Sequence, residues 1–220
     1  MKQANQTAGA IIEGRAVPLQ IANCDTDQIM PKQFLRGIDK AGLDQGVFHD
    51  LRHAHDGTPR ADFVLNQPKY AGASIILAGA NFGCGSSREH AVWGLQQAGI
   101  KAVVAPSFGE IFYSNAMNNG LMLAMVSEAD MQAMMASALR SEEALAVRID
   151  VARLRVESDA GSAPFSLSAR HQQMFMQGLD MLGVSLQHLE AIKRFAAEHR
   201  ARHPWMADVA QRMHERVHQG

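Results

Sequence analysis

The stretch "ASIILAGANFGCGSSREHAVWGLQQAGIKAVVAPS", residues 73–107, decides the fold, because two short apolar runs flank a glycine-rich turn and a helical pattern. The runs "ASIILAG" (73–79) and "KAVVAPS" (101–107) have the length and composition of buried strands. Between them, apolar residues follow helical spacing from Ser87 onward, and Gly99 ends the segment. The stretch therefore predicts a strand–loop–helix–strand unit with two parallel strands and a right-handed crossover.

The loop of this unit, residues 79–87, follows the carboxyl end of the first strand, where open α/β sheets bind ligands. It matches neither common nucleotide loop. It lacks the Gly-Lys-Ser/Thr ending of a Walker loop, and Arg88 stands where the dinucleotide fingerprint needs a small residue. Ser86 and Glu89 have the Ser-x-x-Glu spacing of a capping box, and spacing alone favours helix capping over catalysis.

Capping does not account for the rest of the loop. Gly79, Gly83 and Gly85 would bring backbone amides close to a bound group. The helix N-terminus and the forked guanidinium of Arg88 would add positive charge. Together these features predict a receptor for a carboxylate or a phosphate. The same field would stabilise a serine alkoxide, which could then act as a base on a weak carbon acid.

Composition and charge narrow the class of protein. A chain of 220 residues with 47% hydrophobic and 20% charged residues can bury a sizeable core, which excludes a disordered chain. A formal net charge of −1 gives no global field for nucleic acid or an anionic membrane, so small molecules or proteins are the expected partners. The N-terminal sequence has no signal-peptide pattern, and no segment approaches the ~18 apolar residues of a membrane span, so we expect a cytoplasmic protein.

The two cysteines, Cys24 and Cys84, indicate free thiols in a reducing compartment. They are too few to hold an iron–sulfur cluster or a structural zinc ion. Two histidine pairs near the C-terminus have i, i+4 spacing without an identifiable third ligand. No metal site is therefore predicted in this chain, and cluster chemistry would have to come from another chain.

The segments before the central stretch predict a strand, a polar loop and a helix. An apolar run ends at the acidic turn Asp25, Thr26 and Asp27, and Pro31 stands at a plausible helix start. Two carboxylates in one turn could bind a cation, but they more commonly organise the turn itself, and we interpret the turn as loop-organising. Residues 44–70 contain several turn formers and predict irregular structure with short elements.

The segments after the central stretch predict further helices and strands. "FGEIFYSNAMNNGLMLAMV" (108–126) predicts a helix that stops at Asn-Asn-Gly and a following strand. Ser127 is placed to open the next helix. "LAVRIDV" (145–151) and "PFSLS" (164–168) alternate as strands do, and the chain is helical and charged from Ser185 onward.

Several blocks of the sequence resemble one known family. They are "NCDTDQIMPKQFL" (23–35), "FVLNQPKY" (63–70), "NFGCGSSREHAVWGL" (81–95), "APSFGEIFYSNAMNNGLM" (105–122) and "ARHQQMFMQGLDMLGVSLQ" (169–187). The blocks are similar to the small subunits of 3-isopropylmalate dehydratases, which contain an aconitase-type swivelling domain. The resemblance runs from about Ala16 to Ala191.

The resemblance implies an α/β fold, with a swivelling β/β/α domain of the aconitase type over residues 1–190. A helical charged tail, residues 191–220, would follow, with a break at Pro204. It implies a hydro-lyase that interconverts 2-isopropylmalate and 3-isopropylmalate by dehydration and rehydration in leucine biosynthesis. No cofactor is expected in this chain, because in the family a large subunit carries the [4Fe-4S] cluster. The expected assembly is a heterodimer or a higher complex.

The resemblance also implies roles for single residues. Ser86 would be the catalytic base that removes the proton next to a carboxylate, and Gly85, Ser87 and Arg88 would hold the substrate. A second group is expected at or near the site: Asp25, Thr26, Asp27, Arg36 and His90. The segment "LRGIDKAG" around Arg36 would tune the choice of substrate, with a solvated helix face as the alternative. For His90 a structural role is the more common one.

Three departures from the family pattern bear on the substrate. Val92 and Ala124 replace common prolines, and the tail beyond about Arg200 is longer than expected. Two alternatives therefore stay open. One is a related hydro-lyase acting on a 2-methylmalate, dimethylmalate or homocitrate type of acid. The other is a non-catalytic module that binds carboxylates.

Overall fold

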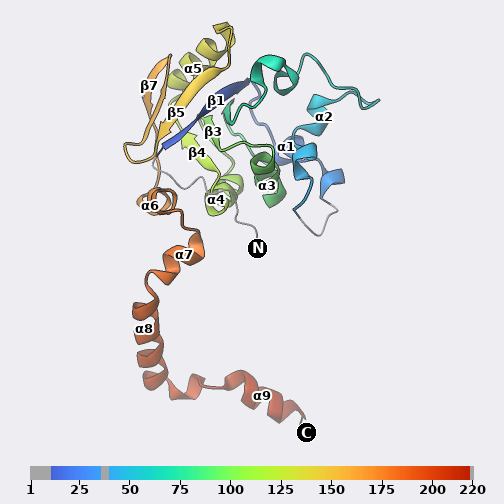
Figure 1. Ribbon diagram of the computed structural model, residues 1–220. Coiled ribbons are helices and arrows are strands. Elements are labelled where there is room, and N and C mark those ends of the chain that lie inside the picture. The colour runs from blue at the N-terminus through green and yellow to red at the C-terminus, as the bar shows by residue number, and fades with distance from the viewer. Residues whose placement is uncertain (1–10, 36–39, 219–220) are drawn as a thin grey trace. The chain divides into compact units, whose positions relative to one another are not determined.

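The structure is a computed structural model, and it describes residues 11–35 and 40–218 (Figure 1). The chain divides into two compact units, Met1–Asp180 and Met181–Gly220, which are called the body and the tail below.

A mixed seven-stranded sheet forms the centre of the body, in the order β4-β3-β2-β1-β5-β6-β7. Four strands run parallel: β1 (Ile11–Leu19), β2 (Ile75–Ala78), β3 (Ala102–Ala105) and β4 (Met122–Met125). Antiparallel pairing adds β5 (Leu145–Asp150), β6 (Arg155–Ser158) and β7 (Gly161–Pro164). Every residue of β2 and of β3 is buried, which explains their unbroken apolar sequences and confirms both predicted strands.

Helices cover both faces of the sheet (Figure 1). Helices α3 (Glu89–Gln97) and α4 (Glu110–Asn119) pack against each other, while α5 (Glu128–Arg140) contacts β1 and β2 from the other face. The predicted helix stop is confirmed, because Gly120 ends α4 in the left-handed conformation. Ser127 caps α5, as predicted, by accepting a hydrogen bond from the backbone N–H of Asp130.

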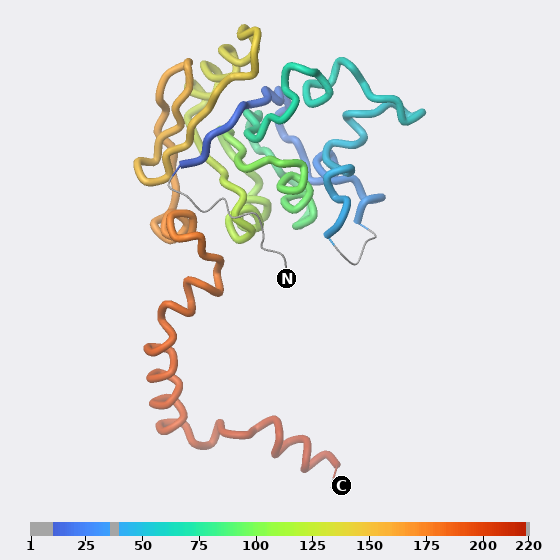
Figure 2. Tube along the Cα trace, viewed as in Figure 1, coloured from blue at the N-terminus to red at the C-terminus, as the bar shows by residue number. Residues whose placement is uncertain are grey.

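The connection from β1 to β2 is long, and its described parts consist of short elements whose winding path Figure 2 shows. It contains α1 (Thr26–Ile29), η1 (Lys32–Phe34), η2 (Leu43–Gly46), α2 (His49–Arg52), η3 (Val64–Asn66) and η4 (Pro68–Tyr70). The prediction of short elements over residues 44–70 is thus confirmed. Gly94 of α3 lets this connection approach closely, because a Cβ there would lie 2.2 Å from the Met30 side chain.

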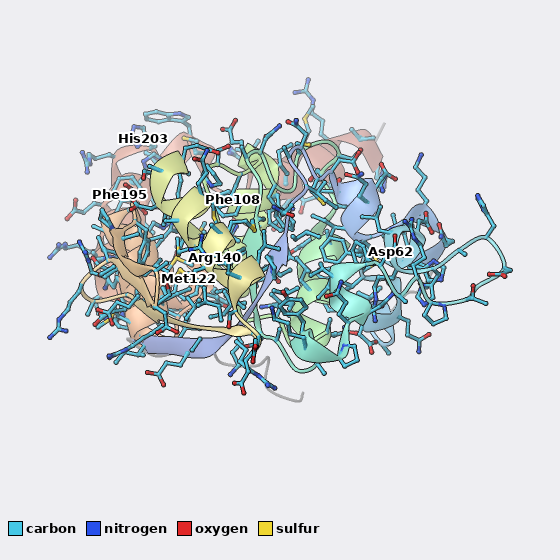
Figure 3. The ribbon with its side chains drawn as sticks, turned by 90° about the horizontal axis from the view of Figure 1, so that it is seen from above. Asp62, Phe108, Met122, Arg140, Phe195 and His203 are labelled. Carbon is cyan, nitrogen blue, oxygen red and sulfur yellow. The ribbon has the colours of Figure 1, made fainter. Side chains whose placement is uncertain are left out.

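The hydrophobic core lies between the sheet and its helices and continues into the connection through residues such as Phe48 and Tyr70. Figure 3 views the side chains from above and labels Met122 of β4 and Arg140 at the end of α5. Because the parallel strands are held in this core, the loops that follow them start from fixed positions.

The helix predicted to start at Pro31 begins earlier, at Thr26. Its start is fixed by Asp25, whose side chain accepts a hydrogen bond from the N–H of Gln28 while the Gln28 side chain accepts one from the N–H of Asp25. In the described residues directly after Pro31, 31–35, the chain forms the 3₁₀ turn η1 and not an α-helix. The prediction was wrong because the capping box has aspartate and glutamine in place of the more familiar serine and glutamate.

The strand predicted at residues 164–168 is displaced. The observed strand is β7, Gly161–Pro164, which pairs with β6 across the turn at Ser158 and Gly161. Ser168 instead caps α6 (Ala169–Gln177). The predicted strand cannot extend to residue 168, because Ser168 is the N-cap residue from which the chain enters α6.

The tail consists of α7 (Met181–Leu186), α8 (Leu189–Arg202), the 3₁₀ turn η5 (Pro204–Met206) and α9 (Val209–His218). Helical structure thus begins before the predicted start at Ser185, and the predicted break at Pro204 is confirmed. The tail helices carry exposed apolar side chains at helical spacing: Leu189, Ile192 and Phe195 on α8, and Val209, Met213 and Val217 on α9. In the described part of the chain, no helix combines the length and the apolar character needed to cross a membrane.

Candidate functional site

Three loops meet at the carboxyl edge of the parallel strands. The loops follow β1, β2 and β3, and isolated bridges join them at Asp25–Cys84 and at Phe82–Phe108. Phe108 is labelled in Figure 3. The glycine-rich loop therefore lies at the carboxyl end of its strand, as predicted from residues 73–107.

Backbone contacts hold the middle of the glycine-rich loop between its two neighbours. The N–H of Gly83 donates to the carbonyl oxygen of Cys24 at 2.7 Å, and the N–H of Gly109 donates to that of Phe82 at 2.9 Å. A Cβ on Gly109 would lie 2.5 Å from the Gly83 carbonyl oxygen. The close approach of the two backbones thus requires glycine at residue 109.

The tip of the loop is open to solvent. Gly85, Ser86 and Ser87 are exposed, and they come directly before the N-terminal turn of α3. Within residues 11–35 and 40–218, the hydroxyls of both serines have no hydrogen-bond partner. The same holds there for the backbone N–H groups of residues 85–88. Free N–H groups at a helix N-terminus form a site for an anion.

The predicted capping box of Ser86 and Glu89 is not formed. The N-cap of α3 is Arg88, and no side chain makes a capping hydrogen bond. Glu89 instead accepts a hydrogen bond at 2.6 Å from the side-chain amide of Asn119, which comes from α4. A tertiary contact thus replaces the local cap, and the Ser86 hydroxyl stays available for other chemistry.

Arg88 is held by an acidic partner that sequence reasoning did not identify. Its side chain is only 10% exposed, and Nη1 donates to the carboxylate of Asp27 and, at 3.4 Å, to the carbonyl oxygen of Met30. In the described part of the chain, the Nε and Nη2 atoms make no hydrogen bond. The guanidinium therefore has a fixed position and keeps donors for an incoming carboxylate.

The acidic turn after β1 lies against the loop. Asp25 caps α1, and Thr26 makes two bonds across to the loop. The Thr26 N–H donates to the carbonyl oxygen of Cys84 at 2.9 Å, and its hydroxyl donates to that of Ser86, also at 2.9 Å. Residues predicted separately as a turn and a loop thus form one structure.

Two further residues were predicted at or near the site, His90 and Arg36. His90 is half-buried on α3, with its ring centroid 4.8 Å from that of Trp93. Arg36 lies outside the described residues.

Sequence reasoning missed two side chains of the neighbouring loops, Asn23 and Ser107, that support the glycine-rich loop by binding Asn81. Asn81 has a positive φ of 59°, and its side-chain amide donates to Asn23 Oδ1 at 2.8 Å. Its backbone N–H donates to the hydroxyl of Ser107 at 2.9 Å. The signal available in the sequence was the asparagine before Phe82, because asparagine tolerates the left-handed region that this turn uses.

The two cysteines are free and differ in burial, as Cys24 is buried and Cys84 is half-buried. Burial, with smaller contributions from the neighbouring Asp25 and Cys84, raises the pKa of the Cys24 thiol from 9.0 to about 12. Cys24 therefore stays protonated well above neutral pH.

Alkylation of the folded protein at about pH 8 is expected to modify Cys84 and to spare Cys24, because the thiolate is the reactive form. Intact-mass measurement with iodoacetamide should show one added group in buffer and two in denaturant. Raising the pH to about 10 should leave Cys24 unmodified, since its raised pKa lies above that value. Equal labelling of both thiols in the folded protein would contradict the burial of Cys24.

The residues of this chain do not fit an iron–sulfur cluster. Such clusters are held mainly by several cysteine thiolates, and here Cys24 is buried in the core. Among the described residues, no group of three or more His, Cys, Asp or Glu side chains could hold a metal ion.

Comparison with known proteins places this site in a family. A family model described as the aconitase C-terminal domain matches residues 9–128. The fold is thus that of an aconitase-type domain, which confirms the predicted fold class. The 3-isopropylmalate dehydratase small subunit 1 of Chromobacterium violaceum is 58% identical over 199 residues, covering 90% of this chain and 93% of that protein. The chain belongs to the family of 3-isopropylmalate dehydratase small subunits.

Further matches agree. The 3-isopropylmalate dehydratase small subunit of Rhizobium rhizogenes is 43% identical over 197 residues, covering 89% of this chain and 97% of that protein. The crystal structure of a 3-isopropylmalate dehydratase from Methanocaldococcus jannaschii has 27% identity and a TM-score of 0.60, covering 84% of this chain and 99% of that one. A model of the small subunit's C-terminal domain matches residues 182–209, so the resemblance extends beyond its predicted end at Ala191.

Proposed function

We propose that this chain is the small-subunit half of a 3-isopropylmalate dehydratase, which interconverts 2-isopropylmalate and 3-isopropylmalate in leucine biosynthesis. The observation that carries the proposal is the loop tip, residues 85–88. It combines two free hydroxyls, free backbone N–H groups at the start of α3 and the fixed guanidinium of Arg88. The family relatives supply the name of the reaction.

The first task of the site is to bind a carboxylate. The free N–H groups of Gly85, Ser86 and Ser87 would donate to its oxygens, and the α3 N-terminus would add partial positive charge. Arg88 would contribute the donors that Asp27 leaves free. Because Arg88 is held before the substrate arrives, little of its side-chain freedom remains to be lost on binding.

The second task is proton transfer, which we assign to Ser86. Its oxygen, as the alkoxide, accepts the proton from the carbon next to the bound carboxylate. The electron pair of the broken C–H bond forms the C=C bond, and hydroxide leaves the adjacent carbon. When water adds back with the hydroxyl on the carbon that lost the proton, and the proton on the carbon that lost the hydroxide, the isomeric product forms. Nearby N–H groups would stabilise the alkoxide, which otherwise is too basic to exist near neutral pH.

We propose that the site is half of a complete one, because no group of the described side chains could hold a metal ion and the chain has only two cysteines. We propose that a large subunit carries the [4Fe-4S] cluster, as in the aconitase-type family, and joins this chain in a heterodimer or higher complex. The two free cysteines agree with a reducing compartment, and we propose the cytoplasm.

The proposal is tested by anaerobic hydration of isopropylmaleate, followed by loss of absorbance. The chain is assayed alone, with the cluster-loaded large subunit, and with the large subunit only. Turnover that requires both chains supports the proposal. Absence of turnover in a formed complex with an intact cluster would overturn the assignment to the leucine pathway.

A panel of 2-hydroxy diacids, assayed with the same complex, distinguishes the related hydro-lyases by kcat/KM. Val92 and Ala124, the two residues at which the resemblance implies proline in relatives, are both buried in the core of the body. These two departures therefore do not favour another diacid. A 2-methylmalate or homocitrate type of acid that is turned over faster than isopropylmalate would replace the proposed substrate.

Replacing Arg88 by lysine is expected to raise KM by about tenfold or more, because an ammonium group lacks the planar fork that pairs with Asp27 and a carboxylate together. The effect on kcat should be smaller. Steady-state kinetics of the complex measure both. Arg60→Lys is the matched control, because Arg60 also pairs with an aspartate, Asp62, but on the exposed surface. Equal KM values in the two variants would remove Arg88 from the binding site.

A further inference from the structure

We propose that Thr26 is a positioning residue for the reaction: its hydroxyl fixes the backbone at Ser86 and thereby aims the Ser86 hydroxyl. The inference rests on the proposed function and adds to it a residue from a different loop. Thr26 belongs to the turn after β1, whereas Ser86 follows β2.

The contact is partly buried and connects distant parts of the sequence. Thr26 is 1% exposed, and its hydroxyl donates to the Ser86 carbonyl oxygen at 2.9 Å. Its backbone N–H donates to the Cys84 carbonyl oxygen, also at 2.9 Å. One residue therefore holds two carbonyl groups on either side of Gly85.

The Thr26 hydroxyl is not needed for its own helix. Asp25 already caps α1 through the N–H of Gln28, and the Gln28 side chain completes the capping box. A buried threonine hydroxyl must still find a partner, and here that partner is the Ser86 carbonyl group. The bond therefore serves the loop.

The loop has few other restraints at this point. Gly85 has a φ of +92°, which gives the backbone a conformation that other residues rarely adopt. Ser86 is exposed, and within the described residues the Thr26 bond is the one hydrogen bond that its peptide or side chain makes. The orientation of the Ser86 peptide therefore depends on Thr26.

The next residue of α1 acts on the other end of the loop tip. Asp27 holds Arg88, so the consecutive residues Thr26 and Asp27 anchor Ser86 and Arg88. Ser87 lies between the two anchors and is exposed. The turn after β1 thus sets the position of the proposed base relative to the proposed carboxylate donor.

Proton transfer is sensitive to this geometry. A displacement of about 1 Å in a reacting group can lower the rate by about 10²-fold. Carboxylate binding depends mainly on Arg88, which keeps its contacts to Asp27 and Met30 when the Thr26 hydroxyl is removed. Loss of the hydroxyl should therefore act on kcat more than on KM.

The test compares Thr26→Val with Thr26→Ser in the complex with the cluster-loaded large subunit. Valine keeps the shape and removes the donor, whereas serine keeps the donor and removes the methyl group. We expect kcat to fall by about tenfold or more for Thr26→Val and by less than about threefold for Thr26→Ser, with KM changed less than about twofold in both. A substrate deuterated at the carbon that loses the proton should show a larger isotope effect with Thr26→Val, because proton transfer becomes slower.

Melting curves keep the result interpretable, and every assay is run below the melting transition of the variant. Thr26→Ala is the second donor-free variant, to be used if the valine variant does not fold. Unchanged kcat and an unchanged isotope effect in a folded donor-free variant would overturn the inference. Equal losses of kcat in Thr26→Val and Thr26→Ser would also overturn it. An inactive unmodified complex would instead overturn the proposed function.

Discussion

Ser86→Ala is expected to lower kcat for isopropylmaleate hydration by about 10²–10⁴-fold, the contribution typical of a general acid or base. The hydroxyl of Ser86 is exposed and, within the described residues, has no partner, so its removal should not disturb the fold. KM should change little, because the backbone N–H groups and Arg88 remain. Steady-state kinetics of the complex, together with melting curves, measure these quantities.

Ser114→Ala provides the control for this substitution, since Ser114 is an exposed serine on a different element, α4. It should leave both kcat and KM unchanged. A Ser86→Ala complex that retains more than about a tenth of the unmodified kcat would exclude Ser86 as the base. The proton would then have to be taken by another group, with the exposed Ser87 the first residue to examine.

Gly109→Ala is expected to damage both the fold and the reaction. The added methyl group would lie 2.5 Å from the Gly83 carbonyl oxygen and 2.9 Å from Cys84 Cα, so one backbone segment must move. Overpacking of this kind costs about 1–3 kcal/mol, which corresponds to a melting temperature lower by roughly 2–12 °C for a domain of this size. The displaced loop should lower kcat/KM by about 10²-fold. Calorimetry and the hydration assay check the two effects.

Gly120→Ala separates a loss of stability from a displacement of the loop. Gly120 has a φ of +76° with open space around its Cα, so alanine there strains the backbone without a clash. A loss of about 1 kcal/mol in stability is expected, with kcat/KM unchanged. If Gly120→Ala lowered kcat/KM as much as Gly109→Ala, the effect of Gly109→Ala could not be assigned to the loop.

The central part of the fold could be predicted because its pattern is strong. The strands Ile75–Ala78 and Ala102–Ala105 are buried at every position, and a short apolar run bounded by turn residues is typical of such strands. The hairpin of β6 and β7 could not be predicted from residues 155–164 with the same precision. Most of its residues are half-buried or exposed, so the alternation that marks a strand is weak there.

The candidate site was predictable as a set of residues but not as a set of contacts. The glycines, serines and arginine of the loop indicated an anion site, and the structure brings the turn of Asp25 and Asp27 to the same place. The pairing of Arg88 with Asp27 leaves no trace in local spacing. The capping prediction for Glu89 was wrong for the same reason, because its partner Asn119 comes from a different helix.

The bonds that shape the loop tip connect it to the turn after β1, although the long connection between β1 and β2 separates the two in the sequence. The unit of β2, α3 and β3 can form early from nearby residues, but it would then carry a loop without its anchors. Bringing the two ends of so long a connection together costs chain entropy, and this cost rises only slowly with the length of the connection. The ends must meet before the anchoring contacts can form. During refolding, activity should therefore return only when the N-terminal strand docks, later than the segment that contains Ser86, the proposed base, becomes structured.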